Sequence, residues 1–285
     1  MSRDVLIYGP RGSKPLRAFS EFYLADWVEQ HVPTSSVPVE DYRLVIVDGL
    51  RKQNKKILYR CQQAGIPLVV CDLGYIGRPN YFQVGFDRLN WLSNENKTDR
   101  MEKLGITIPK RVHGDYILIL GQNPGDASHD FNEFELDCLY QGWADRLRKI
   151  TDRPIHFRPH PRAWEMSIEC DHVDRGPLDQ ALRGAHCCVT FNSTSGTDAL
   201  LAGKPLFSAT SAQYAKLATH VLLMNIESIE HPRFPNRDDL IDHFSKVAYS
   251  QWTQKEIASG EWAEVYDAVR SRTAGSDLAL FWQRP

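Results

Sequence analysis

Short, continuous apolar runs separated by helix-forming segments recur along this chain of 285 residues. Strands that are apolar on both faces need cover on both faces, which is the usual situation in a parallel sheet. We interpret as strands residues 5–8, 44–47, 68–71, 116–120, 155–157, 187–191 and 205–207. The sequence therefore predicts an α/β protein with parallel sheets that helices cover on both sides.

The length of the chain and one polar segment predict two domains. A chain of 285 residues is long for one domain and suits two. The polar residues 93–103, and then 106–111 with a proline, are typical of a linker. We therefore predict two Rossmann-like, doubly wound domains facing a cleft, over residues 1–113 and 114–285, with C-terminal helices that pack back.

The clearest helices lie between the strand-like runs. In the first half they are residues 19–30 and 56–64. In the second half they are residues 133–150, 178–183 and 197–202, and residues 252–270 form a helix at the end.

Composition narrows the class of protein. An apolar content of 42% and a charged content of 25% are typical of soluble globular chains. The net charge of −2 gives no overall attraction to polyanions, although it does not reveal local basic patches. Without a signal-like or membrane-spanning apolar run, we expect a cytoplasmic protein with no membrane span. The six cysteines form no CxxC pair, so we interpret them as reduced thiols.

Residues 192–205, NSTSGTDALLAGKP, are a polar turn that runs directly into an apolar helix. If Ser195 or a neighbour caps this helix, backbone amides and hydroxyls can bind a phosphate. These groups are the amides near Gly196 and Thr197 and the hydroxyls of Ser193, Thr194 and Ser195. Asp198 either completes a capping box or accepts hydrogen bonds from ribose hydroxyls. Phosphate binding and an ordinary helix start explain this motif equally well.

A second polar segment, RPHPR at residues 158–162, follows the apolar run 155–157. Its prolines stiffen the backbone and leave Arg158, His160 and Arg162 at the carboxyl end of a strand. Two guanidinium groups and an imidazole suit a diphosphate or a sugar carboxylate. A stiff loop with solvated arginines is the alternative.

A third segment, GQNPGDAS at residues 121–128, directly follows the strand that ends at Leu120. Glycines let a backbone approach a ligand closely, and Asp126 and Ser128 either cap the next helix or face the ligand. An ordinary turn explains this segment almost as well. All three segments follow strands of one predicted sheet, so they should share the edge at which α/β proteins bind ligands.

The first half has two similar loops, GPRGSK at residues 9–14 and CDLGYIGR at residues 71–78. Asp72 could act as a base on an acceptor hydroxyl, although a buried, capping Asp is at least as good an interpretation.

With these loops in place, the sequence resembles GT-B type glycosyltransferases, and more narrowly the capsule polysaccharide transferases that move Kdo-like sugars. The motifs GQNPGDAS, RPHP and STSGTDALLAGKP occur in that family's order. DLGYIGR at residues 72–78 and QWTQKEIASGEW at residues 251–262 are similar to further segments of the same family.

The resemblance implies an acceptor over the first domain and a nucleotide sugar in the second. It implies that Asp198 contacts the ribose, that residues 193–196 contact phosphate, that His160 lies at the donor, and that Gln122 and Asp126 lie near the sugar. Our catalytic candidates are Asp72, Asp126 and His160. Our substrate-binding candidates are Gly9, Arg11, Tyr75, Arg78, Gly121, Gln122, Ser128, Arg158, Arg162, Asn192, Ser193, Thr194, Ser195, Gly196 and Asp198.

The acceptor stays open between a hydroxymethylated pyrimidine in DNA, as in related bacteriophage enzymes, and a capsule-type glycan. Arg51, Lys52, Lys55 and Lys56 either contact DNA phosphates or form a solvated helix face. The chain has no Asp-x-Asp pair, so we predict transfer without a metal ion and with no cofactor beyond the nucleotide sugar. A sugar-nucleotide epimerase or hydrolase, or a non-catalytic nucleotide-sugar or DNA-binding module, are the alternatives.

Overall fold

The computed structural model describes residues 3–23, 25–209, 211–220 and 225–263. The chain divides into two compact units, Met1–Gly105 with Phe244–Pro285, and Ile106–His243. The predicted boundary is residue 113, with C-terminal helices of the second domain that pack back. In the structure the chain leaves the first unit after Gly105 and returns to it from Phe244.

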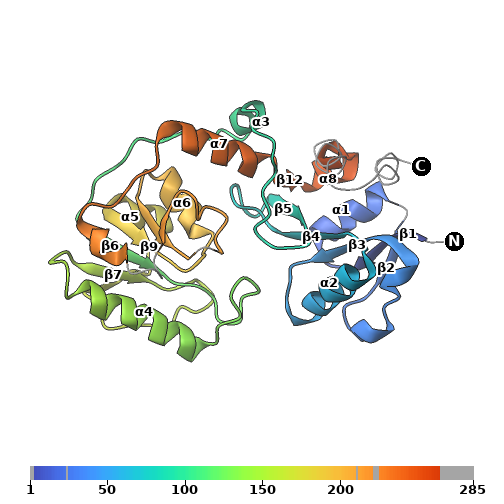
Figure 1. The fold of residues 1–285 in the computed structure, drawn as a ribbon, viewed down its shortest axis with the longest axis horizontal. Helices are drawn as coiled ribbons and strands as arrows, with labels where there is room; N and C mark the ends of the chain where they lie inside the picture. The colour runs from blue at the N-terminus through green and yellow to red at the C-terminus, as the bar shows by residue number, and fades with distance from the viewer. Residues whose placement is uncertain (1–2, 24, 210, 221–224, 264–285) are drawn as a thin grey trace. The chain divides into compact units, whose positions relative to one another are not determined.

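The first unit contains a six-stranded sheet in the order β12-β5-β4-β3-β1-β2 (Figure 1). Its strands are β1 (Arg3–Tyr8), β2 (Asp26–Val28), β3 (Tyr42–Asp48), β4 (Leu68–Leu73), β5 (Tyr81–Phe86) and β12 (Gln251–Thr253). The first four strands are parallel, whereas β5 and β12 are antiparallel to their neighbours. Its helices are α1 (Lys14–Phe22), α2 (Lys52–Ala64), α3 (Asp99–Lys103) and α8 (Gln254–Ser259), with 3-10 turns at Thr34–Ser36 and Val39–Asp41.

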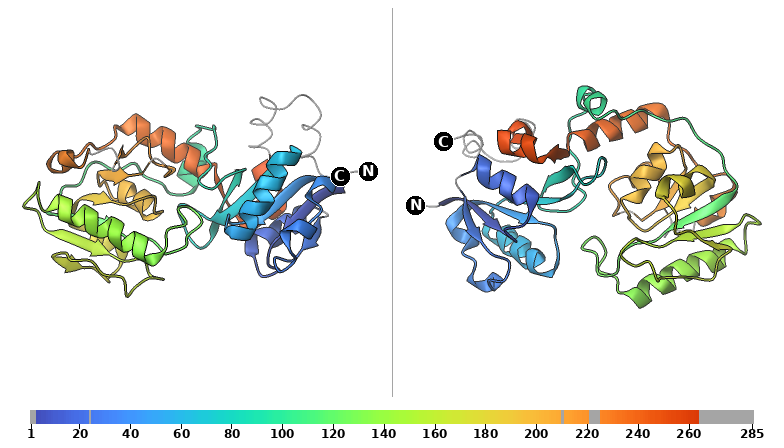
Figure 2. Two further views of the ribbon diagram at one scale, coloured as in Figure 1. Left: turned by 60° about the horizontal axis from the view of Figure 1, so that its bottom comes forward. Right: turned by 180° about the vertical axis from the view of Figure 1, so that it is seen from behind.

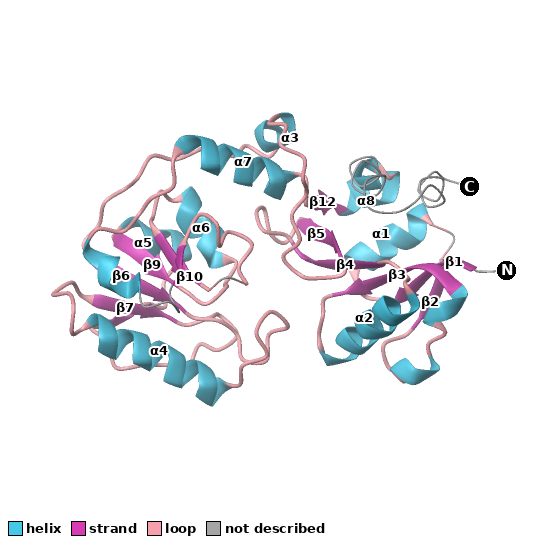
Figure 3. Ribbon diagram, viewed as in Figure 1, coloured by secondary structure: helices cyan, strands magenta, loops and turns pink. Residues whose placement is uncertain are grey.

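The second unit contains a fully parallel sheet in the order β11-β10-β9-β6-β7-β8 (Figure 3). Its strands are β6 (Tyr116–Leu120), β7 (Ile155–Arg158), β8 (His172–Val173), β9 (Ala185–Val189), β10 (Leu206–Ser208) and β11 (Thr219–His220). Its helices are α4 (Glu133–Leu147), α5 (Leu178–Arg183), α6 (Ser195–Leu201) and a 3-10 helix (Asn225–Glu230). α7 (Arg237–Ala248) continues past the end of this unit.

In this second sheet, α4 covers one face while α5 and α6 cover the other (Figures 1 and 2). Right-handed crossovers require this arrangement, because the chain moves from β6 to β7 in one direction and from β8 through β9 to β10 in the other. The predicted fold, two Rossmann-like α/β units, is confirmed.

Burial on both faces of the sheet explains why the sequences of the strands are unbroken apolar runs. Leu44, Val45, Ile46 and Val47 in β3 are all fully buried, because helices cover both sides of the sheet. The hydrophobic core of the first unit lies between its sheet and the helices α1 and α8. In this core the ring of Phe19 packs edge-on against that of Trp262.

Two helix predictions are wrong in their limits. The predicted helix 19–30 is instead α1, which starts at Lys14 after the capping hydroxyl of Ser13, and then β2. Pairing of β2 with β1 overrides the local helix propensity there. The predicted helix 252–270 begins with β12, and α8 follows it; a turn at Gly260 then ends α8, and residues 261–263 are helical again at the end of the described range.

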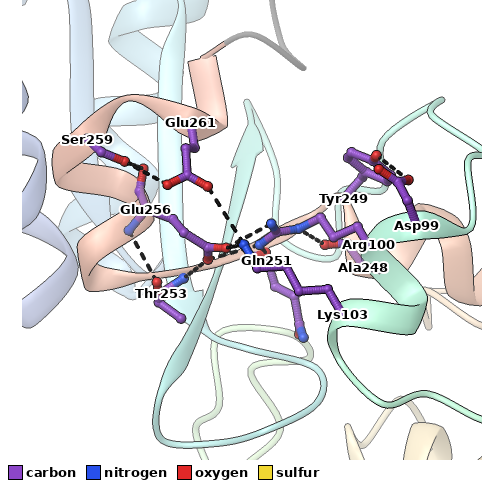
Figure 4. A network of polar contacts seen from close by, with 10 residues as sticks. All are labelled: Asp99, Arg100, Lys103, Ala248, Tyr249, Gln251, Thr253, Glu256, Ser259 and Glu261. Atoms are coloured by element: carbon purple, nitrogen blue, oxygen red, sulfur yellow. Dashed lines mark hydrogen bonds and ion pairs between the residues drawn. The ribbon is translucent and has the colours of Figure 1, made fainter.

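A buried arginine joins the returning C-terminal segment to α3 (Figure 4). The side chain of Arg100 donates to both carboxylate oxygens of Glu256, at 2.9 and 3.0 Å, and to the carbonyls of Ala248 and Gln251. Its guanidinium carbon lies 3.7 Å from the ring centroid of Trp252. Burial alone would raise the pKa of the Glu256 carboxyl, but hydrogen bonds from Arg100 and Lys103 lower it to about 2.

The same segment holds the loop between β4 and β5. The side-chain amide of Gln251, which is fully buried, accepts from the Ile76 N–H at 2.9 Å and donates to the Ile76 carbonyl at 3.1 Å. Residues separated by most of the chain therefore fix the conformation of the DLGYIGR loop.

We expect Glu256→Ala to lower the free energy of unfolding by roughly 3–5 kcal/mol, because it leaves the Arg100 charge buried and unpaired. The lowered pKa of Glu256 stabilises the wild-type fold above its ordinary value of 4.5, and this contribution is lost as the pH falls towards 2. Urea denaturation at several pH values measures both effects.

Lys103→Ala is the matched control, because its side chain is 58% exposed and its ion pair with Glu256 should contribute about 1 kcal/mol or less. Equal losses of unfolding free energy in the two variants would show that the buried pair of Arg100 and Glu256 does not stabilise the fold in the way expected.

Candidate functional site

Three polar loops meet at the carboxyl edge of the second sheet. They follow β6, β7 and β9, and β6 lies between the other two strands. The Gly121 N–H donates to the Arg158 carbonyl at 2.8 Å, so the first two loops are in direct contact. A Cβ atom on Gly121 would lie 3.1 Å from that carbonyl oxygen, which explains the glycine. The prediction that these motifs share one edge is confirmed.

Asn192 connects the loops after β6 and β9. Its side-chain oxygen accepts from Gln122 Nε2 at 2.6 Å and from the Ser128 hydroxyl at 3.1 Å. Its Nδ2 donates to the Ser128 carbonyl at 3.0 Å and to the Ser211 hydroxyl at 3.1 Å. An amide side chain offers two acceptor and two donor positions, and all four are used.

Asn192 was predicted to bind substrate, and this pattern shows that its side chain is fully used within the fold. The residue is buried, and its backbone N–H also donates to Gln122 Oε1 at 2.9 Å. Asn192 therefore positions the loops, and Gln122, whose own N–H donates to the Tyr140 hydroxyl, is held from two sides.

The start of α6 differs from the prediction. The amides of Gly196 and Thr197 donate to the carbonyls of Ser193 and Thr194, each at 2.9 Å, so they are not free for a phosphate. The N-cap residue, Thr194, makes no side-chain capping bond, and Ser195 is not the cap. In this tight first turn, i→i+3 hydrogen bonds satisfy two backbone amides that are usually left without a partner at the start of an α-helix.

Tyr214 explains both the glycine and the shape of this turn. Its buried hydroxyl donates to the Ser193 carbonyl, and a Cβ atom on Gly196 would lie 2.3 Å from its ring carbon Cζ. The half-buried hydroxyls of Thr194 and Ser195 remain at the surface of the turn. Phosphate contacts there would come from these side chains rather than from the amides of Gly196 and Thr197.

The loop after β7 provides an unsatisfied cation. Nη1 of Arg158 is buried and has no hydrogen-bond partner among the described residues, while its guanidinium lies 5.4 Å from the ring centroid of Trp164. Burial lowers the pKa of Arg158, and the charge of Asp174 opposes this effect. An anionic ligand would satisfy the remaining donor.

His160 is oriented by its own loop. The Arg162 N–H donates to His160 Nδ1 at 3.1 Å, so the neutral ring carries its proton on Nε2. The half-buried imidazole can therefore donate through Nε2, whereas the side chain of Arg162 is exposed. These two residues thus have different roles in the loop.

Asp126 lies in an exposed turn. Its carboxylate accepts from the Ser128 N–H at 2.9 Å, and its carbonyl accepts from the amides of His129 and Asp130. These contacts are those of the ordinary turn that the sequence analysis gives as the alternative.

A pocket of about 660 Å³ lies between α5 and α6. Leu178, Leu182 and Leu201 supply apolar lining, and the half-buried Asp198 is the sequence-predicted site residue among its lining residues. Its other lining residues include Arg183, Ala202 and Lys204, which precede β9 and β10, so this pocket lies toward the end of the sheet away from the three loops.

Two predicted ligand-binding residues, Gly9 and Arg11, lie in the loop after β1 and make contacts with β2 and the residue after it. The Gly9 N–H donates to the Val28 carbonyl at 3.1 Å, and its carbonyl accepts from Trp27 Nε1 at 2.8 Å. The Arg11 guanidinium contacts Glu29 at 3.1 Å and lies 4.7 Å from the ring centroid of Trp27. The pairing of β2 with β1 therefore uses these groups within the fold.

Tyr75 is also corrected, because its side chain is only 1% exposed. Its hydroxyl contacts Gln83 Oε1 at 2.9 Å and the Trp91 carbonyl at 3.0 Å. Arg78, in contrast, is exposed in the same loop. Asp72 is half-buried at the end of β4 and accepts from the Leu73 N–H at 2.7 Å, so it is not a helix cap.

Asp48 is not among the predicted site residues. It ends β3 and pairs in register with Cys71, the residue before Asp72. Burial raises the pKa of Asp48, against a hydrogen bond with Ser13 and the charge of Arg51. An acidic residue that ends an apolar strand before a glycine is the signal that could have identified it.

The sequence matches no protein-family model, and a search of curated proteins finds no relative. The structure is similar to the β-Kdo 2,7 transferase of Thermosulfurimonas dismutans KpsC, with a TM-score of 0.56 and 14% identity, over 95% of this chain and 100% of that one. It is similar to the β-Kdo 2,4 transferase of the same KpsC, with a TM-score of 0.53 and 14% identity, over 86% and 98%. The two-unit α/β fold is therefore that of GT-B glycosyltransferases, as the resemblance implied.

The described residues contain no group of three or more His, Cys, Asp or Glu side chains placed to hold a metal ion. None of the helices in the described ranges has the length and apolarity to cross a membrane.

We expect Asn192→Ala to lower the free energy of unfolding by about 1–3 kcal/mol, because Gln122 and Ser128 lose their buried partner. Asn123→Ala is the control, because the half-buried side-chain amide of Asn123 donates to the adjacent Pro124 carbonyl and does not join two loops. Denaturant titration measures both variants. A loss as small for Asn192 as for Asn123 would show that Asn192 does not hold the loops together.

Proposed function

We propose that this protein is a glycosyltransferase that moves a sugar from a nucleotide sugar to a hydroxyl acceptor without a metal ion or further cofactor. The fold shared with the two KpsC transferases and the polar loops at one sheet edge support this proposal. We infer that it acts in the cytoplasm, in agreement with six unpaired cysteines.

The observation that supports the donor assignment is the buried Nη1 of Arg158, which has no hydrogen-bond partner among the described residues. A phosphate oxygen is the natural partner for a buried Arg donor. The half-buried Thr194 and Ser195 add hydroxyl groups at the same edge, and His160 lies in the loop that follows Arg158. Asp198, one turn into α6 after Thr194 and Ser195, is our candidate for the ribose, as the resemblance implies.

In the proposed reaction, the bond between the anomeric carbon and the leaving phosphate breaks, and the acceptor oxygen forms the new bond. Arg158 and His160 stabilise the charge that develops on the leaving phosphate. Asp72 takes the proton of the acceptor hydroxyl as a general base, and Asp126 is a second candidate near the sugar. The raised pKa of Asp48 makes it a further carboxyl able to hold that proton.

The acceptor is either a hydroxymethylated pyrimidine in DNA or a capsule-type glycan. Both carry the primary or secondary hydroxyl that the proposed reaction needs. DNA is favoured by one observation, the basic and acid-free surface of α2.

We expect a nucleotide that fits the donor site to raise the melting temperature, because it binds only the folded protein; at one hundred times its Kd the gain is about 2.7 kcal/mol. Uridine diphosphate, cytidine diphosphate and cytidine monophosphate should be compared by thermal shift. Arg158→Ala should abolish most of the shift, because it removes the phosphate partner.

Arg148→Ala removes a charge at the end of α4 and should leave the nucleotide shift unchanged. If no nucleotide stabilises the wild type, or if the two variants respond alike, the donor assignment is wrong.

We expect Asp72→Asn to reduce sugar transfer by roughly 10²–10⁴-fold, the usual contribution of a general base, and to leave the nucleotide-induced thermal shift unchanged. Mass spectrometry of hydroxymethylated DNA and of a glycan acceptor after incubation with nucleotide sugars measures transfer. Asp41→Asn, at an exposed position, is the control. Turnover of the donor without any acceptor would favour the epimerase or hydrolase alternative instead.

A further inference from the structure

α2 presents an exposed stripe that contains no acidic residue. Lys52, Lys56, Tyr59 and Gln63 lie at successive turns on one side of the helix and are all exposed, Tyr59 to 61%. Lys55 and Gln62 flank this stripe. None of the 13 residues of α2 is Asp or Glu. We call Lys52, Lys55, Lys56, Tyr59, Gln62 and Gln63 the α2 stripe.

Basic residues also occupy the start of α2, where a helix favours negative charge. Arg51 is the N-cap residue and Lys52 is the first helical residue. The partial positive charge at a helix N-terminus makes cations unfavourable there. In the described chain α1 and α2 have no acidic residue in the first turn, whereas α3, α4, α5, α6, α7 and α8 each have at least one.

The two exceptional helices begin at the same edge of the first sheet. α1 follows β1 and α2 follows β3, and these strands are parallel neighbours. Lys14, Arg17, Arg51 and Lys52 are exposed and lie at or near these two helix starts. The positive potential of this edge therefore adds to that of the α2 stripe.

Neighbouring carboxylates do not neutralise the stripe. Arg60, on the flank of α2, contacts Glu40 at 2.6 Å, and Arg11 contacts Glu29 at 3.1 Å. Arg51, Lys52 and Lys56 form no ion pair with any residue that the structure describes. Lys52 and Lys56, the two exposed lysines of the stripe, thus remain available for an external anion.

We propose that the α2 stripe, together with Arg51, binds the phosphates of DNA. Lysine, glutamine and tyrosine side chains are groups that proteins use on the phosphates and sugars of nucleic acids. Lys52 and Lys56 lie one helical turn apart, about 6 Å along the axis, so they can contact separate phosphates. The exposed Tyr59 ring can stack on an unpaired base. This inference selects DNA as the acceptor and in that respect rests on the proposed function.

The test measures binding of fluorescently labelled duplex and single-stranded DNA of mixed sequence by anisotropy, between about 50 and 200 mM salt. Lys52→Glu/Lys56→Glu should weaken binding at least tenfold and lower the slope of log K against log salt by about 2, one unit for each lost contact. Lys149→Glu/Lys255→Glu makes the same change in net charge at two exposed positions on other elements and should bind like the wild type.

Two further variants separate binding from folding and stacking. Lys52→Glu places a carboxylate at a helix N-terminus, so this variant should melt no lower than the wild type while it binds DNA less tightly. Tyr59→Ala should weaken binding of single-stranded DNA by about tenfold, and Tyr59→Phe should not, because the ring is retained.

The proposal is wrong if the wild type does not bind DNA at about 50 mM salt, or if the two double variants bind it equally well. It is also wrong if the stripe binds an acidic polysaccharide such as polygalacturonate more tightly than DNA. Loss of DNA binding with continued transfer to a small hydroxyl acceptor would leave the proposed function intact. DNA binding through the stripe without any sugar transfer would refute the proposed function alone.

Discussion

The parallel pairing of β6 with both β7 and β9 is the constraint on which the second unit depends. It places three chain segments, which are far apart in the sequence, at one edge of one sheet. Asn192 then fixes the positions of two of these loops, because the hydrogen bonds of its side-chain amide join the loop after β9 to the loop after β6. Arg158 at the same edge keeps a buried donor without a partner. A preorganised edge with an unsatisfied cation is suited to an anionic leaving group.

The first unit depends on a different interaction, the return of the chain to complete its sheet. β12 adds to β5, and the buried pair of Arg100 and Glu256 joins this segment to α3. Through Gln251 the same segment holds the backbone of Ile76. The conformation of the loop that carries Asp72 and Arg78 therefore depends on a residue from the C-terminal segment of the chain. The surface of α2, by contrast, is local, and its charges are a property of one helix.

Much of the fold could be predicted, because strands buried on both faces must be apolar. The limits of β6 and α5 were predicted to the residue, and the order of the loop motifs placed them at one edge. Five strands were not predicted: β5 and β12, whose antiparallel pairing depends on distant partners, and the short strands β2, β8 and β11. In the site, the sequence identified the loops but not which of their groups are occupied. Tyr75 and Asn192 are polar in the sequence, and only packing makes them internal.

The sequence by itself determined the α/β class, the alternation of strands and helices, and the acid-free face of α2, because periodicity and composition are local. Only the tertiary structure decided which polar atoms remain available. The amides of Gly196 and Thr197 are used within a tight turn, since Tyr214 packs against Gly196, whereas Arg158 keeps an unpaired donor. Hydrogen-bond partners from remote segments decide this difference, and a linear pattern of residue types contains no information about such partners.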